Sequence, residues 1–547
     1  MNFERRITLM QSKQTRLWVA VAFLFALVAT LFQFGAFLAD SYAAVRFPWK
    51  LDYGEGIVWE QMRLMVAGRG YGAIDRLPAI VFHYPPVYHM LVAALSGACG
   101  LDPLAAGRSV SLGSTLLAGL FAGLISAKTV RADDGPHTAL VCALVSGLTV
   151  FCFSPIAFWA PLMRVDMLSV ALSLAGVLVA MAAFTRSRLI VASGLLFVAA
   201  VFTKQTSIVA PAAVFLTFLL VRPRLAWVLA ATCMVAGLVV LGALQLVTDG
   251  GFIRHIFLYN ANRFDPQRLP WIAVAIISHF FLVSAVVIGV TARLRARWPV
   301  YSSARTAAIV RQRLGAASGD AFLLLILVYA VLAFVMTFTI AKSGSNVNYF
   351  IECMAVLAIV LGVGARDAAN ALLGTVSMPS KRLLAHPVVV PLLIGLQPLV
   401  SGKPSDHAKQ QAVARPAELE ALQAMVRSAS RPVISDDMVL LMRAGVPVQL
   451  EPAIFAELAS TGTWNEAPFV ERIRARRFAF FITTGQRGDW LFDSRYNPAV
   501  ADAMDAAYPI RRDLAGYSLH FPREEARQPR RAVPQILGAQ TPVSVAD

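Results

Sequence analysis

Long apolar runs alternate with short polar segments along most of the chain, for example Leu17–Leu38, Gly113–Ala127, Ala226–Val247 and Ala321–Ile340. Runs of about 20 residues match the length of helix that crosses the hydrocarbon core of a bilayer. Charged residues make up only 15% of the 547 residues, against about 25% in an average soluble domain. The pattern therefore predicts a mainly α-helical, polytopic transmembrane bundle.

Basic residues gather between the apolar runs, and the net charge is +17. Cytoplasmic segments of membrane proteins are enriched in Lys and Arg, whereas nucleic-acid binding requires a basic patch on a soluble face. We therefore place all basic clusters on the cytoplasmic side of the membrane. These clusters are Arg5/Arg6/Lys13/Arg16, Lys128/Arg131, Arg186/Arg188, Arg222/Arg224, Arg293 to Arg313, and Lys381/Arg382. The N-terminus of this inner-membrane protein is then cytoplasmic, its first span is uncleaved, and its C-terminus is periplasmic. About eleven spans result, near residues 17–39, 105–127, 138–158, 167–185, 189–202, 207–221, 225–247, 271–291, 320–341, 349–365 and 387–402.

Two apolar segments are too short to be ordinary spans. If residues 87–99 crossed the membrane, every later basic cluster would lie on the outer side. We therefore expect residues 87–99 to form an interfacial helix in the first outer loop (40–104). Residues 189–221 carry basic clusters at both ends but cannot hold two full spans. They predict a pair of short helices that turn at residues 202–206, and irregular backbone at that depth must line a polar cavity.

The composition becomes polar after residue 402, which predicts domains 1–402 and 403–525 and a disordered tail, 526–547. Alternating patterns predict a small C-terminal α/β domain. Its expected helices are 417–428, 437–444 and 467–476, and its expected strands are 432–435, 446–450 and 478–483. Asp436 and Asp437 lie at a strand-to-helix junction, where helix capping is favoured over a binding role.

The first outer loop carries the acidic segment Leu51-Asp52-Tyr53-Gly54-Glu55-Gly56, followed by a helical pattern at 57–67 and by His83-Tyr84-Pro85-Pro86. A carboxylate at the boundary between water and membrane can act as general base for an acceptor hydroxyl. Asp52 and Glu55 are both candidates for that role. The alternative is a solvated loop in which Glu55 and Glu60 cap a helix.

Two basic side chains near the outer boundary can bind a phosphate. Arg164 precedes Asp166 where the third span meets the fourth, and its guanidinium suits bidentate phosphate binding. The alternative is that Asp166 caps the fourth span and pairs with Arg164. Lys204 lies between the two short helices, where it either binds phosphate or extends to the interface.

Two further polar segments also fall on the outer side in this topology. One contains Asn260, Asn262 and Arg263, and the other contains Lys342, Asn346, Asn348, Tyr349 and Glu352. Amides, hydroxyls and tyrosine suit sugar binding, although polar outer loops are common. All these polar clusters lie on the outer side of the membrane in the predicted topology, and this shared location indicates a site more strongly than any single cluster does.

At these residues the sequence resembles the GT-C superfamily of polyprenyl-phosphate-sugar-dependent transferases, near the protein mannosyltransferase and aminoarabinose transferase families. The matching pieces span roughly residues 15–365 and are the Gly54-Glu55-Gly56 loop, Tyr84-Pro85-Pro86, Arg108, Arg164-Val165-Asp166, Thr203-Lys204-Gln205-Thr206 and Asn346-Val347-Asn348-Tyr349. Many relatives carry adjacent Asp-Glu in the first loop, whereas here Gly54 precedes Glu55. Glu55 lies where that pair would fall, so the resemblance favours Glu55 as the base.

The resemblance implies a hexosyl- or pentosyltransferase that inverts the sugar donated by a polyprenyl phosphate. It implies a donor site of Arg164, Asp166, Lys204, Gln205, Arg263, Lys342, Asn346, Asn348 and Tyr349, and an acceptor or loop set of His83, Tyr84, Asn260, Asn262 and Glu352. The acceptor would be a cell-envelope glycan, lipid or protein. Some relatives use a divalent metal, for which Asp52, Glu55 and Asp166 are the candidate ligands, but no metal site is predicted. The alternatives are a transporter of lipid-linked sugars, for which no internal repeat is found, and a non-catalytic assembly protein.

Overall fold

The computed structural model describes residues 2–302, 309, 312–314, 318–374, 386–401, 407, 411 and 415–523. The predicted basic cluster Lys381/Arg382 and the predicted disordered tail 526–547 lie outside these residues. The chain divides into two compact units. The helical unit comprises residues 1–415 and 438–442, and the C-terminal unit comprises residues 416–437 and 443–547.

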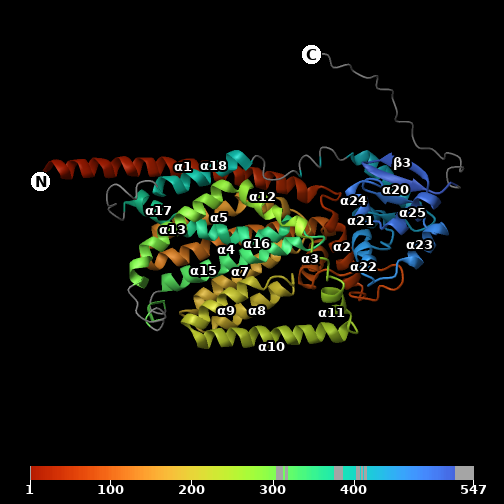
Figure 1. The fold of residues 1–547 in the computed structure, drawn as a ribbon, viewed down its shortest axis with the longest axis horizontal. Coiled ribbons are helices and arrows are strands. Elements are labelled where there is room, and N and C mark those ends of the chain that lie inside the picture. Colours follow the sequence, from red (N-terminus) through yellow and green to blue (C-terminus); the bar gives the residue numbers. More distant parts are fainter. Residues whose placement is uncertain are drawn as a thin grey trace, which may run out of the picture. The chain divides into compact units, whose positions relative to one another are not determined.

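The helical unit is built from helices throughout (Figure 1). Its first elements are α1 (Asn2–Arg46), α2 (Tyr53–Val66), α3 (Val87–Cys99), α4 (Pro103–Asp134), α5 (Pro136–Thr149), η1 (Val150–Cys152), α6 (Ser154–Trp159), α7 (Asp166–Ala183), α8 (Leu189–Val201), α9 (Val209–Val221) and α10 (Pro223–Val247). They are followed by α11 (Gly251–Ile253), η2 (Arg254–Leu258), η3 (Pro266–Arg268), α12 (Pro270–Ser278), α13 (Phe280–Ser302), α15 (Ser318–Met336), η4 (Thr337–Ala341), η5 (Val347–Phe350), α16 (Ile351–Gly364), α17 (Arg366–Leu373) and α18 (His386–Ser401).

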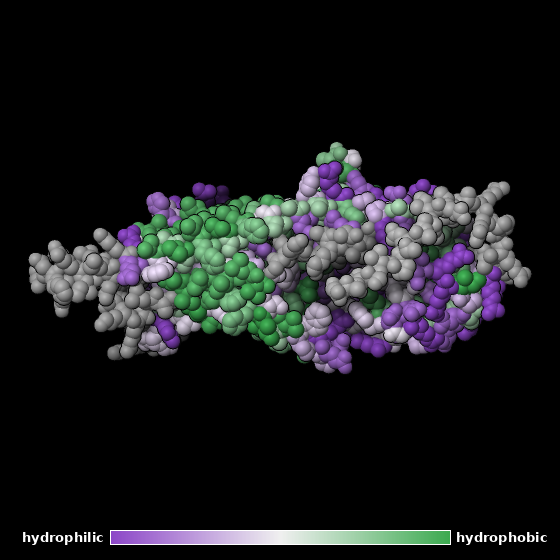
Figure 2. Space-filling view, turned by 90° about the horizontal axis from the view of Figure 1, so that it is seen from above, coloured by the Kyte–Doolittle hydropathy of each residue, from purple (hydrophilic) through white to green (hydrophobic). Residues whose placement is uncertain are grey.

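Six helical segments among the described residues are long and apolar enough to cross a membrane, and a bent pair of helices makes a seventh. The remaining predicted spans fall on shorter apolar helices, namely 136–152, 189–201, 209–221 and 387–401. Figure 2 shows a wide hydrophobic area on the surface of this unit. Many large apolar side chains of α1 and α10 are exposed, among them Phe32 at 78% and Leu246 at 82%. Such a surface suits contact with lipid.

The two short apolar segments form the helices that the pattern predicts. Residues 87–99 form α3, and residues 189–221 form α8 and α9 around a turn at 202–208. The interfacial position of α3 stays a prediction. The turn between α8 and α9 projects polar side chains toward the site described below.

The span predicted over 271–291 is not one straight helix. The segments 266–278 and 280–298 are bent by 76° at His279. His279 Nδ1 donates to the carbonyl of Ala275 at 2.8 Å, and Gln397 Nε2 donates to the carbonyl of Ser278 at 2.8 Å. Side chains therefore satisfy backbone groups that the break removes from the helical ladder, which the apolar pattern alone could not reveal.

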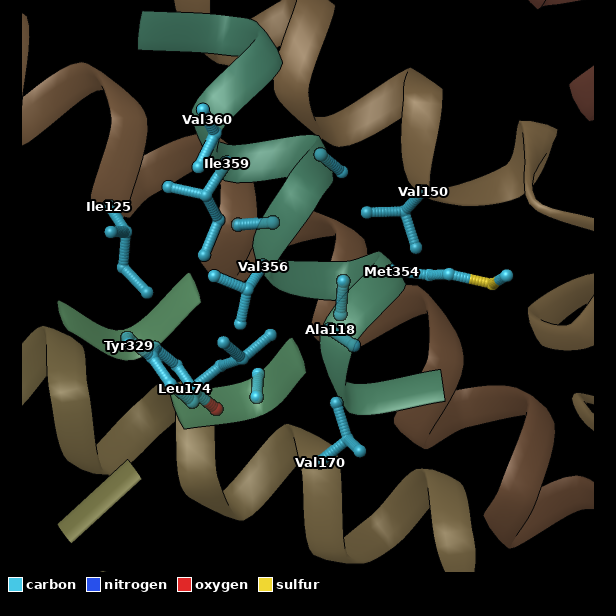
Figure 3. Packing of buried hydrophobic residues seen from close by; sticks show 14 of the residues in the cluster. Ala118, Ile125, Val150, Val170, Leu174, Tyr329, Met354, Val356, Ile359 and Val360 are labelled. Carbon is cyan, nitrogen blue, oxygen red and sulfur yellow. The ribbon is translucent and has the colours of Figure 1, made fainter. Parts of the chain in front are cut away.

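Helix α16 lies in the middle of the helical unit, and twelve of its fourteen residues are buried. Figure 3 shows Val356 and Ile359 of α16 packed among side chains of α4, α7 and α15. Gly362 allows the close approach of α5, because a Cβ at this position would lie 2.6 Å from the carbonyl oxygen of Cys142. This core fixes the relative positions of the helices that carry the site.

The C-terminal unit is a small α/β unit with a four-stranded sheet. Its elements are α20 (Pro416–Arg427), β1 (Ile434–Ser435), α22 (Pro452–Ser460), α23 (Ala467–Arg474), β2 (Phe481–Thr483), α24 (Trp490–Asp493), α25 (Pro498–Ala507), β3 (Ile510–Leu514) and β4 (Tyr517–Phe521). Helix α21 (Met438–Ala444) follows β1 in the chain, and its residues 438–442 belong to the helical unit. The strand order is β1-β2-β4-β3; β1 pairs parallel to β2, whereas β4 pairs antiparallel to both neighbours. The α/β class predicted for this part is confirmed.

One predicted strand is wrong, because residues 446–450 are not in a strand. Their alternation of apolar and polar residues resembles a strand, but Pro447 cannot donate to a sheet ladder. The side chain of Gln449 instead donates to the carbonyl of Pro447 at 3.4 Å. The sequence pattern predicts no element at α22, α24, α25, β3 or β4.

Candidate active site

The acidic first loop starts α2 with a capping box. Asp52 Oδ2 accepts the backbone N–H of Gly54 at 2.8 Å, and Glu55 Oε2 accepts those of Leu51 and Asp52 at 2.8 and 3.3 Å. Both carboxylates satisfy backbone donors that the first helical turn leaves without partners. Helix α2 therefore begins at Tyr53, before the predicted residue 57. Glu60, the other residue of the capping alternative, instead binds Arg63 at 2.7 Å.

The carboxylate of Glu55 forms a fully buried, bidentate ion pair with Arg108 of α4. Both bonds are 2.7 Å long, and both side chains are 0% exposed. The remaining N–H groups of Arg108 bind the carbonyl oxygens of Ala44, Phe47 and Trp49. All five guanidinium donors are thus used, which holds the end of α1, the start of α2 and α4 together.

Burial raises the pKa of Glu55, but the charge and hydrogen bonds of Arg108 and the backbone N–H groups of Met163 and Leu51 outweigh it, so the pKa lies below its usual value. Met163 binds Glu55 Oε1 at 3.0 Å, and both oxygens are therefore occupied by donors. A general base needs a free lone pair within reach of the acceptor hydroxyl. This geometry argues against Glu55 as the base, although the resemblance favours it.

Asp52 has a different environment from Glu55, because its partner is the accessible Arg164. Arg164 Nη1 donates to Asp52 Oδ2 at 3.1 Å, and the two side chains are 14% and 16% exposed. A Cβ at position 54 would lie 1.1 Å from Nη1, so glycine at that position lets the guanidinium reach the loop. The buried Nε of Arg164 has no hydrogen-bond partner, which leaves one donor for a ligand.

Arg164 is also held by two aromatic side chains. Its guanidinium carbon lies 5.3 Å from the ring centre of Trp159, a cation–π distance. Its Nη2 donates to the hydroxyl of Tyr84 at 3.4 Å. Burial raises the pKa of Tyr84 to about 12, with a smaller opposing effect of Arg164. The phenol therefore stays protonated at neutral pH and keeps a hydrogen to donate.

Asp166, the first residue of α7, collects donors from three segments. Its Oδ2 accepts from Trp159 Nε1 at 2.8 Å, and its Oδ1 accepts from Lys204 Nζ at 2.6 Å and from Asn348 Nδ2 at 2.8 Å. Lys204 Nζ also lies 5.1 Å from the ring centre of Tyr349. The pairing of Asp166 with Arg164 expected from their spacing is replaced by pairing with Lys204. Four predicted site residues, Asp166, Lys204, Asn348 and Tyr349, thus meet at one point.

A cavity adjoins this group, and the space between its atoms, open solvent included, is about 420 Å³. Its polar wall contains Asp166, Lys204, Asn348, Tyr349 and Glu352, and its other lining residues are Ser169, Val170, Thr206, Ser207, Ala333, Met336 and Ile351. Concave sites with a few convergent polar groups among apolar residues are typical of small-molecule binding. Glu352, expected on the acceptor side, lines the same cavity as Lys204.

His83, Gln205 and Asn260 form a second polar group close to this site. Gln205 Nε2 donates to the carbonyl of His83 at 3.0 Å, and His83 Nδ1 lies 3.1 Å from Asn260 Oδ1. The buried Oε1 of Gln205 has no partner, so it can accept a hydrogen bond from a ligand. This group connects the turn between α8 and α9 with both outer loops.

Four further predicted residues, Asn262, Arg263, Lys342 and Asn346, are likewise not among the residues that line the cavity. Asn262 donates to the carbonyl of Ser343 at 2.9 Å, and Arg263 and Lys342 belong to the same pairing of two loops. Asn346 is exposed and caps its own turn at the N–H of Val347. Trp159 and Ser169 were missed, because aromatic and hydroxyl residues inside apolar runs give no separate sequence signal.

The carboxylates considered as metal ligands do not form a metal site. Across the described ranges, no group of three or more His, Cys, Asp or Glu residues is placed to hold a metal ion. Each carboxylate instead forms its own ion pair, Asp52 with Arg164, Glu55 with Arg108 and Asp166 with Lys204.

In the C-terminal unit, Asp436 binds side chains rather than capping a helix. Its carboxylate accepts from the N–H of Thr484 at 2.8 Å, from Arg495 Nη1 at 2.6 Å and from the hydroxyl of Tyr496 at 2.9 Å. Asp437 accepts from the hydroxyl of Tyr517 at 2.6 Å. The capping interpretation of Asp436 is therefore wrong, and this carboxylate organises the end of the parallel strand pair.

Neither a known protein family nor a curated protein sequence matches the chain. Among solved structures, ArnT from Cupriavidus metallidurans in the apo state is similar, with a TM-score of 0.50 at 15% identity over 94% of this chain and 98% of ArnT. The same protein bound to undecaprenyl phosphate gives 0.48 at 15% identity over 86% and 92%. The apo oligosaccharyltransferase of Archaeoglobus fulgidus gives 0.47 at 11% identity over 85% and 69%.

The match to apo ArnT extends over nearly the full length of both chains. At 15% identity it bears on the fold, and it agrees with the helical unit and C-terminal sheet described above. This chain is a multi-pass membrane protein with the GT-C fold.

Proposed function

We propose that this chain is an inverting membrane glycosyltransferase that transfers a sugar from a polyprenyl-phosphate donor to an acceptor hydroxyl. The observation that carries the proposal is that two ion pairs, the partly exposed Asp52–Arg164 and the more buried Asp166–Lys204, both contact Trp159. The fold shared with ArnT and the sequence resemblance support the donor class. An enzyme of this type needs a base, a leaving-phosphate site and a sugar cavity in one place.

Asp52 is the general base in this proposal. Its Oδ2 accepts from Arg164 and Gly54, and its side chain is partly exposed, whereas Glu55 is fully buried. Asp52 takes the proton of the acceptor hydroxyl, whose oxygen attacks C1 of the sugar. The bond between C1 and the phosphate oxygen breaks, and the lipid phosphate leaves with its electron pair.

Lys204 and Arg164 stabilise the leaving phosphate. Both are cations with at least one donor that can turn to a ligand, since Lys204 has three N–H donors and Arg164 has its unpartnered Nε. Fixed positive groups placed where charge develops lower the barrier of such a transfer. Asp166 holds Lys204 in position and offsets its charge while the site is empty.

The site is proposed to face the outer side of the inner membrane. The N-terminus would then be cytoplasmic and the C-terminal unit periplasmic, in agreement with the basic clusters of the sequence. The acceptor would be a glycan, lipid or protein of the cell envelope.

The test is the transfer activity of Asp52→Asn in proteoliposomes with undecaprenyl-phosphate sugars and cell-envelope acceptors. General-base catalysis contributes about 10²–10⁴-fold, so we expect kcat to fall by that factor while donor binding is retained. Asp75→Asn is the matched control, because Asp75 lies in the same loop and its side chain is 71% exposed. It should retain wild-type activity.

Full transfer by Asp52→Asn would refute the role of this carboxylate. Full transfer by Asp52→Asn, by Arg164→Met and by Lys204→Met alike would refute the proposed active site as a whole.

A further inference from the structure

Glu352 is the acidic residue in the cavity wall whose role the transfer mechanism does not explain. It lies in the first turn of α16, next to Asn348 and Tyr349 along the same wall. A carboxyl group inside a helical membrane unit is costly unless it has a partner, so it marks a functional position by default.

The ion pairs of the site leave Glu352 without a cation. Lys204 pairs with Asp166 at 2.6 Å and Arg164 with Asp52 at 3.1 Å. Within the described part of the chain, the hydrogen-bond partner of Glu352 is instead a neutral hydroxyl, that of Tyr329, which donates to Oε1 at 2.8 Å. The cavity thus has the Lys204–Asp166 ion pair at one end and a separate carboxyl group at Glu352.

Tyr329 fixes the orientation of this carboxyl group. It projects from α15, is 1% exposed, and packs in the core with Leu174 and Val356 (Figure 3). With Oε1 bound by Tyr329, Oε2 is the oxygen of Glu352 that remains to bind a ligand. Tyr329 therefore acts as a positioning residue for Glu352.

The chemistry of this wall separates the two parts of a glycosyl phosphate. Like charges repel, so the phosphate binds at Lys204 and not at Glu352. The portion of the donor next to Glu352 must supply hydrogen-bond donors, which the hydroxyl or amino groups of a sugar provide and a lipid tail does not. The hydroxyls of Ser169, Thr206 and Ser207 in the same cavity are consistent with a polar, uncharged ligand.

We propose that Glu352 determines donor specificity by accepting a hydrogen bond from a ring substituent of the transferred sugar. This inference rests on the proposed function, since it assigns a part of the donor to each end of the cavity. A site built to bind a substrate hydroxyl discriminates strongly against an analogue that lacks it, because its own polar group is left unpaired.

The experiment compares the binding of undecaprenyl phosphate alone with the binding of undecaprenyl-phosphate glucose and undecaprenyl-phosphate arabinose to the full chain in nanodiscs. The wild type should bind at least one sugar-bearing lipid about 10-fold or more tightly than the bare lipid. Glu352→Gln, which keeps the side-chain volume, should reduce this ratio about 10-fold and change the Kd of the bare lipid less than 2-fold.

Tyr329→Phe should reduce the same ratio about 3-fold by releasing the carboxyl group. Cys353→Ala, the next residue of α16 and not part of the cavity wall, is the matched control and should leave the ratio unchanged. Thermal unfolding of each variant in nanodiscs shows whether it is folded.

The inference is overturned if Glu352→Gln leaves the ratio unchanged, if it weakens both lipids equally, or if the wild type binds no sugar-bearing lipid more tightly than the bare one. Lys204→Met reports on the proposed function separately. It should weaken the bare lipid as well, and unchanged binding of that lipid would refute the phosphate site and not the role of Glu352.

Discussion

Arg108 and Glu55 form a bidentate ion pair from which water is excluded on both sides, since neither side chain is exposed. Removal of one partner of a buried ion pair leaves an uncompensated charge, which costs about 3–5 kcal/mol. We expect Glu55→Ala to destabilise the helical unit by this amount, as measured by thermal unfolding in detergent. Asp52→Asn should unfold close to the wild-type temperature because Arg164 keeps access to solvent.

Because of this ion pair, the contribution of Glu55 to the stability of the folded protein depends on pH. Its pKa in the folded protein is below the usual 4.5, because Arg108 and backbone donors outweigh the effect of burial. The unfolded state therefore binds the proton more readily, so this stabilisation is present above pH 4.5 and is lost as the pH falls through the folded pKa. An unfolding temperature that did not change between pH 6 and pH 3 would contradict this.

Asp166 and Lys204 should behave as one unit. Asp166→Asn and Lys204→Met each disrupt the 2.6 Å ion pair, and Asp166→Asn also weakens the positioning of Asn348 and Trp159. Residues in one network show coupling energies of about 0.5–3 kcal/mol. We expect the double variant to lose less activity than the product of the two single effects, in a double-mutant cycle on kcat/KM. Multiplicative losses would show that the two side chains act independently.

His255 should make the protein less stable in mild acid. Burial is the main cause that lowers the pKa of His255 to about 4, while the hydrogen bond to Gly72 opposes it and His83 and Arg254 add to it. Its Nδ1 accepts the N–H of Phe82 at 3.0 Å and its Nε2 donates to Gly72 at 2.7 Å, which requires the neutral ring.

Because the folded pKa of His255 is depressed below the ordinary 6.5, the unfolded state takes up the proton first. Stability is full above pH 6.5 and falls as the pH drops toward about 4. His255→Gln should show a smaller difference in unfolding temperature between pH 7 and pH 5 than the wild type. An equal difference would assign the effect to other groups, such as His89.

Asp436 should be essential for the C-terminal unit. Its replacement by Ala leaves Arg495, the Tyr496 hydroxyl and the Thr484 N–H without their shared acceptor, a loss of about 3–5 kcal/mol for a buried charge pair. Limited proteolysis of the full chain should then cleave within residues 416–523. Asp513→Asn, at an exposed position that is hydrogen-bonded to Ser518, is the control and should resist cleavage as the wild type does.

The sequence pattern predicts the helices well because lipid imposes a strong constraint, as the short pair α8 and α9 illustrates. It predicts the edge hairpin poorly. Strand β3 contains the exposed Arg511 and Arg512 and joins β4 through Ala515 and Gly516, so it lacks the apolar alternation and the Asn-Gly turn that indicate a hairpin.

The candidate site shows the same division. Asp52, Arg164, Asp166 and Lys204 were all identified from polar residues beside apolar runs. The sequence did not reveal which carboxylate pairs with which cation, because the partners lie far apart in the chain. Arg108 lies 53 residues from Glu55, and Lys204 lies 38 residues from Asp166. In the first loop Glu55 is buried and Asp52 is partly exposed, and this difference follows from their partner residues, Arg108 and Arg164.

The bend at His279 has a consequence for how the sequence of this chain evolves. The side chains of His279 and Gln397 come from two separate segments and together bind the backbone groups of Ala275, Ser278 and Leu282 around the break. Replacement of one leaves buried polar groups that the other cannot satisfy. These two positions should therefore change together among descendants of this chain, and a lineage that straightened the helix would be free to lose both.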